Sequence, residues 1–244
     1  MQKNTKTYTV IDSTFLNPKA KHIALQSLDE TLPAFIPGQF ITVHFDHQGK
    51  SYRRSYSIAS IPGRDQSLDF AASYVENGPG SDYLFALTAG DRVELSGPFG
   101  RLVLKEESVK RLFLIATGTG ITPYRAMLPA LTTLMQETGT HVKIIQGVQF
   151  RHDVLYAADF LAWAAENPGL AEYHTYLSRE DLSVSQANHE KSGYVQQSLS
   201  DATATEDVVY LCGNPFMIDA AFAQLQAIGF ASSQIRREKY ISSK

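Results

Sequence analysis

The sequence predicts two domains, an antiparallel six-stranded β-barrel followed by an α/β domain built on a parallel sheet. Two observations predict this arrangement. Short β-prone segments separated by turn residues fill the first part of the chain, and from Arg111 onward apolar strand-like runs alternate with helical patterns. The pattern changes near residues 105–110, so we expect an N-terminal domain at 1–106 and a C-terminal domain at 107–244. A length of 244 residues suits two domains of medium size.

The first domain should contain six strands and one helix. Repeated short strands with turns between them indicate an antiparallel barrel. The helix is expected at 82–87, where Ser81 is a suitable N-cap. The strands are expected at 7–11, 23–27, 40–45, 54–59, 68–75 and 92–95.

The second domain should contain a buried parallel sheet with helices on both faces. Residues 112–116 form a continuous apolar run, which is typical of a strand that is covered on both sides. A helix should follow with Thr122 as its cap and Pro123 in its first turn. Further strands are expected at 142–148, 173–177 and 208–212, and further helices at 155–166, 194–199 and 215–228.

The composition is that of an ordered globular protein with no basic footprint. Hydrophobic residues make up 43% of the chain and charged residues 19%, and the net charge is −3, so we expect no nucleic-acid partner. The only cysteine, Cys212, cannot form an internal disulfide and fits a reducing compartment. No apolar run is long enough to span a membrane. We expect a cytoplasmic monomer without membrane contact and, since His44 and His47 lack further ligands nearby, without a metal site.

One stretch of the first domain combines three kinds of chemistry within four residues. Arg54 offers a cationic fork suited to phosphate, Tyr56 a flat ring with a hydroxyl, and Ser57 a small donor and acceptor. Together they could hold a phosphorylated aromatic cofactor, although a half-buried strand with an exposed arginine is the plainer interpretation. The glycines at 78 and 80 precede a helix start, which either binds an anion or is an ordinary capped loop.

Two turns of the second domain lie where ligands bind in such sheets, at the carboxyl ends of strands. Thr117-Gly118-Thr119-Gly120-Ile121-Thr122-Pro123 brings glycine backbone and a helix N-terminus together, which favours a phosphate. It is not a G-x-G-x-x-G fingerprint. Cys212-Gly213-Asn214-Pro215-Phe216-Met217 ends another strand and begins a helix. Taken alone, Cys212 is more often a buried small hydrophobe than a functional thiol.

These motifs together resemble the ferredoxin–NADP(+) reductase superfamily, as a stand-alone bacterial-type member. Arg54-Ser55-Tyr56-Ser57 is similar to its R-x-Y-S flavin signature, and the two turns resemble its G-T-G-x-T-P and C-G-x-P-x-M motifs. The resemblance runs from Pro37 to Tyr240. It implies an FAD site in the barrel and a nicotinamide nucleotide site in the α/β domain. The residues that it assigns to cofactor binding are Arg54, Tyr56, Ser57, Ile58, Tyr74, Val75, Gly78, Gly80, Ser81, Thr117, Gly118, Gly120, Thr122, Pro123, Ser178, Arg179, Cys212, Gly213, Asn214, Pro215, Met217 and Tyr240.

The resemblance also implies an activity. It implies an FAD-dependent oxidoreductase that takes hydride from NADPH and passes electrons to a one-electron carrier, ferredoxin or flavodoxin. Ser57, Cys212 and Glu238 are the implied hydride-site residues. Whether Tyr240 covers the flavin stays open, because in related proteins the covering aromatic residue is terminal and Tyr240 is not.

Other functions of the same architecture stay open. A free-flavin or quinone reductase and the reductase subunit of an oxygenase are enzyme alternatives. An FAD-binding electron-transfer regulatory subunit is the non-enzyme alternative, and intact Gly118-Thr119-Gly120 and Cys212-Gly213 motifs argue against it.

The choice of coenzyme rests on Ser178 and Arg179, which follow a predicted strand of the parallel sheet. Ser178 can donate to a phosphate oxygen, and Arg179 can hold it with two hydrogen bonds. This pair resembles the 2′-phosphate site of NADPH-using members, and Lys191 could add charge. Glu180 and Asp181 would repel a phosphate if they turned inward, and the plain alternative is a solvated Arg–Glu pair. We expect NADPH, with NADH as the alternative.

Overall fold

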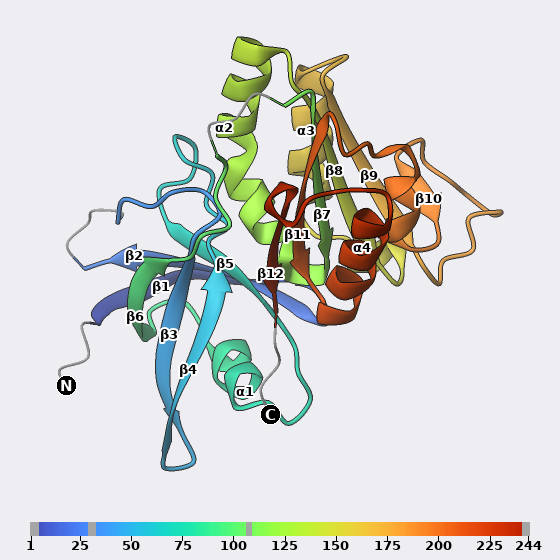
Figure 1. Cartoon of the computed structure of the whole chain (residues 1–244). Helices are drawn as coiled ribbons and strands as arrows, with labels where there is room; N and C mark the ends of the chain where they lie inside the picture. The colour runs from blue at the N-terminus through green and yellow to red at the C-terminus, as the bar shows by residue number, and fades with distance from the viewer. Residues whose placement is uncertain (1–4, 29–32, 106–108, 241–244) are drawn as a thin grey trace. The chain divides into compact units, whose positions relative to one another are not determined.

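The computed structural model describes residues 5–28, 33–105 and 109–240. The chain divides into two compact units, one ending at Leu104 and the other beginning at Lys105 (Figure 1). The predicted boundary between residues 106 and 107 lies outside the described residues and stays a prediction. Within the described ranges, no helix has the length and apolar character needed to cross a membrane.

The first unit is an antiparallel sheet of six strands in the order β4-β3-β6-β1-β2-β5. A single bridge between Ile58 and Phe70 joins the two outer strands, and Ala59 N–H donates to the Asp69 carbonyl at 2.7 Å beside it. The predicted six-stranded barrel is therefore confirmed. Its strands are β1 (Lys6–Asn17), β2 (Ala20–Ser27), β3 (Phe40–His47), β4 (Lys50–Ser57), β5 (Leu68–Ser73) and β6 (Arg92–Phe99).

Alternation of side chains explains how the barrel is filled. In β3, Ile41, Val43 and Phe45 are buried and point into the core, while the residues between them are more exposed. Strand β4 begins four residues before its predicted start, because the positive φ angles of Gln48 and Gly49 make a tight turn that pairs β3 with β4 from its tip. This hairpin places Arg54 and Tyr56 of β4 in a fixed register against β3.

Helix α1 (Pro79–Ala86) of the barrel unit begins earlier than predicted. The expected N-cap role of Ser81 is wrong. Gly78 holds the cap position, and Ser81 lies inside the first turn, where its hydroxyl oxygen accepts a hydrogen bond from Val75 N–H at 2.7 Å. Pro79 starts the helix instead, since proline lacks an N–H that the first turn would leave unpaired.

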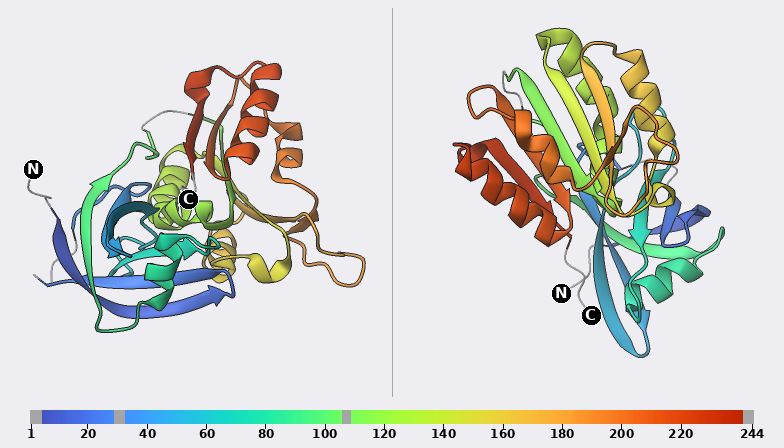
Figure 2. Two further views of the ribbon diagram at one scale, coloured as in Figure 1. Left: turned by 90° about the horizontal axis from the view of Figure 1, so that it is seen from below. Right: turned by 90° about the vertical axis from the view of Figure 1, so that its right-hand side faces the viewer.

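The second unit is a parallel six-stranded sheet in the order β10-β9-β8-β7-β11-β12, as predicted for the α/β domain. The direction of winding reverses between β7 and β11, which is where open parallel sheets bind ligands. Helices α2 and α3 cover one face and α4 the other (Figure 2). The elements are β7 (Arg111–Thr117), α2 (Thr122–Thr138), β8 (His141–Val148), α3 (Ala157–Glu166), β9 (Ala171–Leu177), β10 (Glu190–Ser192), β11 (Asp207–Gly213), α4 (Pro215–Ala227) and β12 (Ile235–Lys239).

Three details of this unit differ from the sequence-based expectations. The α-helix expected at 194–199 is a 3-10 helix, Val195–Asp201, and Tyr194 precedes it in an extended conformation. Thr122 is not a cap: Ile121 precedes α2, and the Thr122 hydroxyl donates to the Thr119 carbonyl. Strand β10 was not predicted, because an outer strand that is short and polar lacks the apolar run of a central strand.

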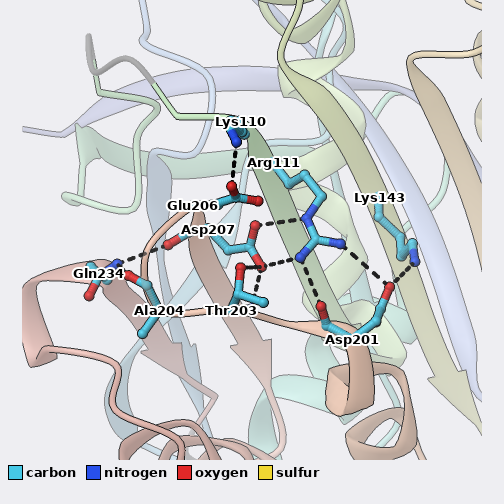
Figure 3. Close-up of polar contacts among 9 residues, drawn as sticks. All are labelled: Lys110, Arg111, Lys143, Asp201, Thr203, Ala204, Glu206, Asp207 and Gln234. Carbon is cyan, nitrogen blue, oxygen red and sulfur yellow. Dashed lines mark hydrogen bonds and ion pairs between the residues drawn. The ribbon is translucent and has the colours of Figure 1, made fainter.

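The amino ends of the neighbouring strands β7 and β11 are joined by an ion pair (Figure 3). Arg111 and Asp207 are register partners in β7 and β11, and the Arg111 guanidinium donates to both Asp207 carboxylate oxygens at 2.8 and 2.7 Å. The Asp207 side chain is fully buried and also accepts from Thr203 N–H at 2.6 Å. This ion pair fixes the register of β7 against β11. It therefore also fixes how the two turns at the carboxyl ends of these strands are placed relative to each other.

Candidate cofactor and coenzyme sites

Strand β4 presents Arg54 and Tyr56 side by side on the barrel unit. The Tyr56 ring lies 5.0 Å from that of Phe70, centroid to centroid, and burial raises its pKa to about 12, against the opposing charge of Arg54. Tyr56 is therefore a neutral phenol at physiological pH. The Arg54 guanidinium lies over the Tyr52 ring at 5.4 Å and donates to the Arg53 carbonyl at 2.9 Å, so both contacts are made within β4.

The first turn of α1 packs directly against these two side chains. A Cβ atom on Gly80 would lie 3.2 Å from the Tyr56 hydroxyl oxygen and 3.3 Å from Arg54 Cγ. Gly80 therefore lets the helix N-terminus, with its free N–H groups, come close to a guanidinium. A helix N-terminus beside an arginine is suited to a phosphate group, so these residues fit the pyrophosphate of FAD.

The other flavin-site candidates occupy the same unit. Ser57 and Ile58 are buried where β4 ends, and Gly78 is buried at the helix start. Tyr74 is exposed after β5, with its ring edge-on to Phe85 at 5.3 Å. Val75 is held by its bond to Ser81, whose hydroxyl hydrogen stays available to a ligand.

In the second unit the two predicted turns fit into each other. A Cβ atom on Gly120 would overlap the Cys212 carbonyl oxygen, and one on Gly213 would lie 2.6 Å from the Thr117 carbonyl oxygen. Asn214 N–H donates to the Thr117 hydroxyl at 2.9 Å. Residues that are 97 positions apart in sequence thus form one structural unit at the carboxyl ends of β7 and β11.

This paired turn has the features of a nucleotide phosphate site. Gly118 has φ 54° and open space where a side chain would stand, so a ligand can approach its backbone. The Asn214 side chain accepts from Phe216 N–H at 2.8 Å, and Met217 is buried in the core; their part in cofactor binding stays a prediction. Pro123 and Pro215 each stand in the first turn of a helix, α2 and α4.

Cys212, Glu238 and Tyr240 lie together at the end of β11 and β12. Cys212 is fully buried and is the register partner of Glu238. Burial, and after it the Glu238 charge, raises the pKa of the Cys212 thiol well above its ordinary value, against the effect of a hydrogen bond with the Tyr240 side chain. The thiol is therefore neutral at physiological pH. Ser57, the third implied hydride-site residue, belongs to the other unit.

Ser178 and Arg179 are held by backbone bonds to the end of β8. Ser178 N–H donates to the Val148 carbonyl at 3.0 Å, and Arg179 N–H donates to the Gln149 carbonyl at 2.9 Å. The Arg179 side chain is exposed, and among the described residues its guanidinium has no hydrogen-bond or ion-pair partner. The backbone of Ser178 and Arg179 is therefore held in place, and the Arg179 guanidinium is available to an anion.

The two acidic residues beside Arg179 are both engaged elsewhere. Glu180 accepts from Arg151 N–H at 2.8 Å and lies 3.5 Å from the Arg151 guanidinium. Asp181 accepts from the Ser183 hydroxyl at 2.6 Å and from Ser183 N–H at 3.0 Å, which lowers the pKa of its carboxyl. Among the described residues, the Arg–Glu pair of the plain alternative does not form between Arg179 and Glu180, and Glu180 pairs with Arg151 instead. Sequence reasoning missed Arg151, because only the fold brings it beside this loop.

Comparisons with known proteins agree with this geometry. The oxidoreductase FAD-binding domain family matches residues 8–104, and the oxidoreductase NAD-binding domain family matches residues 114–222. Ferredoxin–NADP reductase B from Sorangium cellulosum is 32% identical over 211 residues, which cover 83% of this chain and 84% of that protein. The toluate 1,2-dioxygenase electron transfer component of Pseudomonas putida is 30% identical, with 91% of this chain and 63% of that protein covered.

Solved structures show the same fold. A cytochrome P450 reductase from Amycolatopsis superposes with a TM-score of 0.85 at 27% identity, covering 98% of this chain and 71% of that one. A ferredoxin NADP+ reductase from Neisseria gonorrhoeae with bound FAD and NADP gives 0.83 at 22% identity, covering 98% and 99%. The expected FAD and nicotinamide nucleotide cofactors are thus confirmed, whereas the roles of single residues stay predictions.

Proposed function

Because the chain belongs to the ferredoxin–NADP(+) reductase superfamily and is an FAD-dependent NAD(P)H oxidoreductase, we propose that it passes electrons from NADPH to ferredoxin or flavodoxin. The observation that carries the choice of NADPH is Arg179, whose guanidinium is available while Glu180 and Asp181 are bound elsewhere. An arginine without competing carboxylates is suited to the 2′-phosphate that distinguishes NADPH from NADH.

The residues of the chain divide the work between two ligands. FAD, when bound, accepts hydride as an electron pair and releases electrons singly, which is chemistry that the protein itself lacks. Arg54 and the first turn of α1 hold its pyrophosphate, and Tyr56 supplies a neutral ring for packing. The paired turn of Gly118, Gly120 and Gly213 holds the coenzyme pyrophosphate.

Cys212 and Glu238 shape the place for the nicotinamide on the parallel-sheet unit, and Ser57 belongs to the flavin site of the barrel unit. The buried thiol of Cys212 acts by its size and position, since its raised pKa keeps it protonated. Tyr240 lies beside it, with its N–H donating to the Gly213 carbonyl at 2.8 Å, and borders the same place.

The acceptor is proposed by similarity to the Sorangium reductase, of which the chain covers 84%. A second candidate is the reductase component of an oxygenase, favoured by 30% identity to the toluate dioxygenase component; the chain spans less than two thirds of that protein. Free flavin or a quinone as acceptor also fits the architecture. A cytoplasmic location is proposed from the single, buried, unpaired cysteine, and a monomer remains the working assumption.

One experiment separates these acceptors. The FAD-loaded protein is reduced with NADPH, and the rates of reduction of a ferredoxin, a flavodoxin, free FMN and a quinone are compared at equal concentration. We expect ferredoxin or flavodoxin to be reduced with the highest kcat/KM. Faster reduction of free FMN or quinone would replace the proposed acceptor with the corresponding alternative.

A further inference from the structure

Arg151 makes contacts with three parts of the loop that connects β9 to β10. It begins a short 3-10 turn, Arg151–Asp153, just after β8. Its backbone N–H and guanidinium bind Glu180, and its Nη2 donates to the Ser185 carbonyl at 2.7 Å. Its Nε and Nη2 also donate to the two carboxylate oxygens of Glu190, at 2.5 and 2.9 Å. One side chain therefore ties the beginning, middle and end of this loop together.

The buried Glu190 carboxylate holds the Arg151 guanidinium in place. Its side chain is 5% exposed, and it also accepts from Ala187 N–H at 2.9 Å. Bonding to Arg151 lowers the Glu190 pKa to about 2, so its carboxylate is charged throughout the neutral range. A buried carboxylate must keep its partner, so Glu190 holds the Arg151 guanidinium in place although that side chain is 43% exposed.

With Arg151 fixed in this way, Glu180 has a nearby cation that is not Arg179. Glu180 follows Arg179 directly. Without the Arg151 guanidinium, the Glu180 carboxylate would be held only by the Arg151 backbone N–H, and its other oxygen could turn to pair with the Arg179 guanidinium. Such a pair would compete with any phosphate for the same donors. Arg179 itself is placed by its backbone bond to Gln149, which does not depend on Arg151 side-chain contacts.

We propose that Arg151 is a positioning residue for coenzyme choice: it withdraws the Glu180 carboxylate from Arg179, so that Arg179 meets the 2′-phosphate of the coenzyme without a competing negative charge. This rests on the proposed function, in which Ser178 and Arg179 receive that phosphate. In this proposal Arg151 acts through Glu180 and not by contact with the coenzyme. Its effect is electrostatic and concerns only the nucleotide that carries the 2′-phosphate.

The test uses the FAD-loaded full-length protein and two probes that differ by one phosphate, 2′,5′-ADP and 5′-AMP. Their dissociation constants are measured by calorimetry for wild type, Arg151→Ala, Arg151→Lys, Glu180→Gln and the double variant Arg151→Ala/Glu180→Gln. Lys143→Ala is the matched control, because Lys143 is ion-paired to Asp201 at 3.1 Å at the amino edge of the same sheet.

We expect Arg151→Ala to lower the affinity for 2′,5′-ADP by about two- to fivefold, the range of an exposed ion pair. The affinity for 5′-AMP should not change. The loss should shrink as salt is raised from about 0.05 to 0.5 M, since the competing charge is screened. Arg151→Lys should retain most of the affinity. The double variant should recover it, because the competing charge is gone.

Two results would overturn the inference while leaving the coenzyme proposal standing: equal losses for both probes in Arg151→Ala, or no recovery in the double variant. Either would mean that Arg151 only maintains the shape of the loop. A wild-type protein that binds 2′,5′-ADP no better than 5′-AMP would refute the proposed coenzyme and, with it, the role of Arg151.

Discussion

Arg54 is the single side chain whose loss should weaken FAD binding most directly. Its neighbour Gly80 lets a helix N-terminus approach it, so a phosphate there would receive a charge-assisted hydrogen bond. Removing such a bond costs about 1.5–3 kcal/mol, so Arg54→Ala should weaken FAD by roughly ten- to a hundredfold, measured by fluorescence titration of the apoprotein. Arg53→Ala, one residue earlier and exposed, is the control. An equal loss in both variants would point to damage of β4.

Cys212 allows a prediction about rate and pH together. Because the thiol is buried and its pKa is raised, it is neutral across about pH 6–8. Cys212→Ser should keep FAD yet slow flavin reduction by NADPH in stopped flow, since sulfur and oxygen differ in size. The shape of the pH–rate profile over this range should not change, because neither group ionises. Unchanged hydride transfer would reduce Cys212 to a packing residue.

At the scale of elements, the interlocked turns after β7 and β11 act as one unit. Gly120 has no room for a side chain because the Cys212 carbonyl stands against it. Gly120→Ala must push the two turns apart, and overpacking of this kind costs about 1–3 kcal/mol. We expect lost coenzyme binding, retained FAD and a lower melting temperature. Gly139→Ala is the control, since Gly139 ends α2 with open space around it and tests φ strain alone. Normal coenzyme binding in Gly120→Ala would contradict the interlock.

The amino ends of β7 and β11, opposite the two turns, support a separate prediction. Asp207 is fully buried and receives four hydrogen bonds, two from Arg111 and two from Thr203 (Figure 3). Asp207→Ala would leave these donors without their acceptor, and we expect a loss of about 2–4 kcal/mol in the free energy of unfolding, measured in urea. Lys110→Ala removes an exposed pair with Glu206 and should cost less than about 1 kcal/mol. Similar losses in the two variants would show that burial of Asp207 adds nothing.

Over the whole molecule, the sequence predicted the parts governed by local pattern. The apolar run at 112–116 and the alternation in β3 identify their strands because burial dictates those residues. The helix starts at Ser81 and Thr122 were misjudged, since a hydroxyl serves equally well in a turn that it does not cap. Arg151 could not be found, because its partners lie up to 39 residues away in sequence.

The two compact units lead to the last prediction, that changes in one ligand site leave the other ligand unaffected. Arg54 belongs to the barrel unit and Arg179 to the parallel-sheet unit. Arg179→Ala should reduce the binding free energy of NADPH by about 1.5–3 kcal/mol, the scale of a hydrogen bond between charged groups. NADH, which lacks the 2′-phosphate, should bind almost as before. FAD affinity should stay at the wild-type value. Conversely, Arg54→Ala, reconstituted with excess FAD, should retain its affinity for 2′,5′-ADP.

Calorimetry of both variants with both ligands checks this pattern, and Lys191→Ala provides the comparison within the coenzyme unit. Lys191 is exposed on β10 and offers only diffuse charge, so its loss should cost less than about 1 kcal/mol for NADPH. Equal losses of NADPH and NADH in Arg179→Ala would show that Arg179 binds a part common to both coenzymes. The Arg179 guanidinium, held by its backbone at the end of β8 and without a carboxylate partner among the described residues, would then determine affinity without discriminating between them.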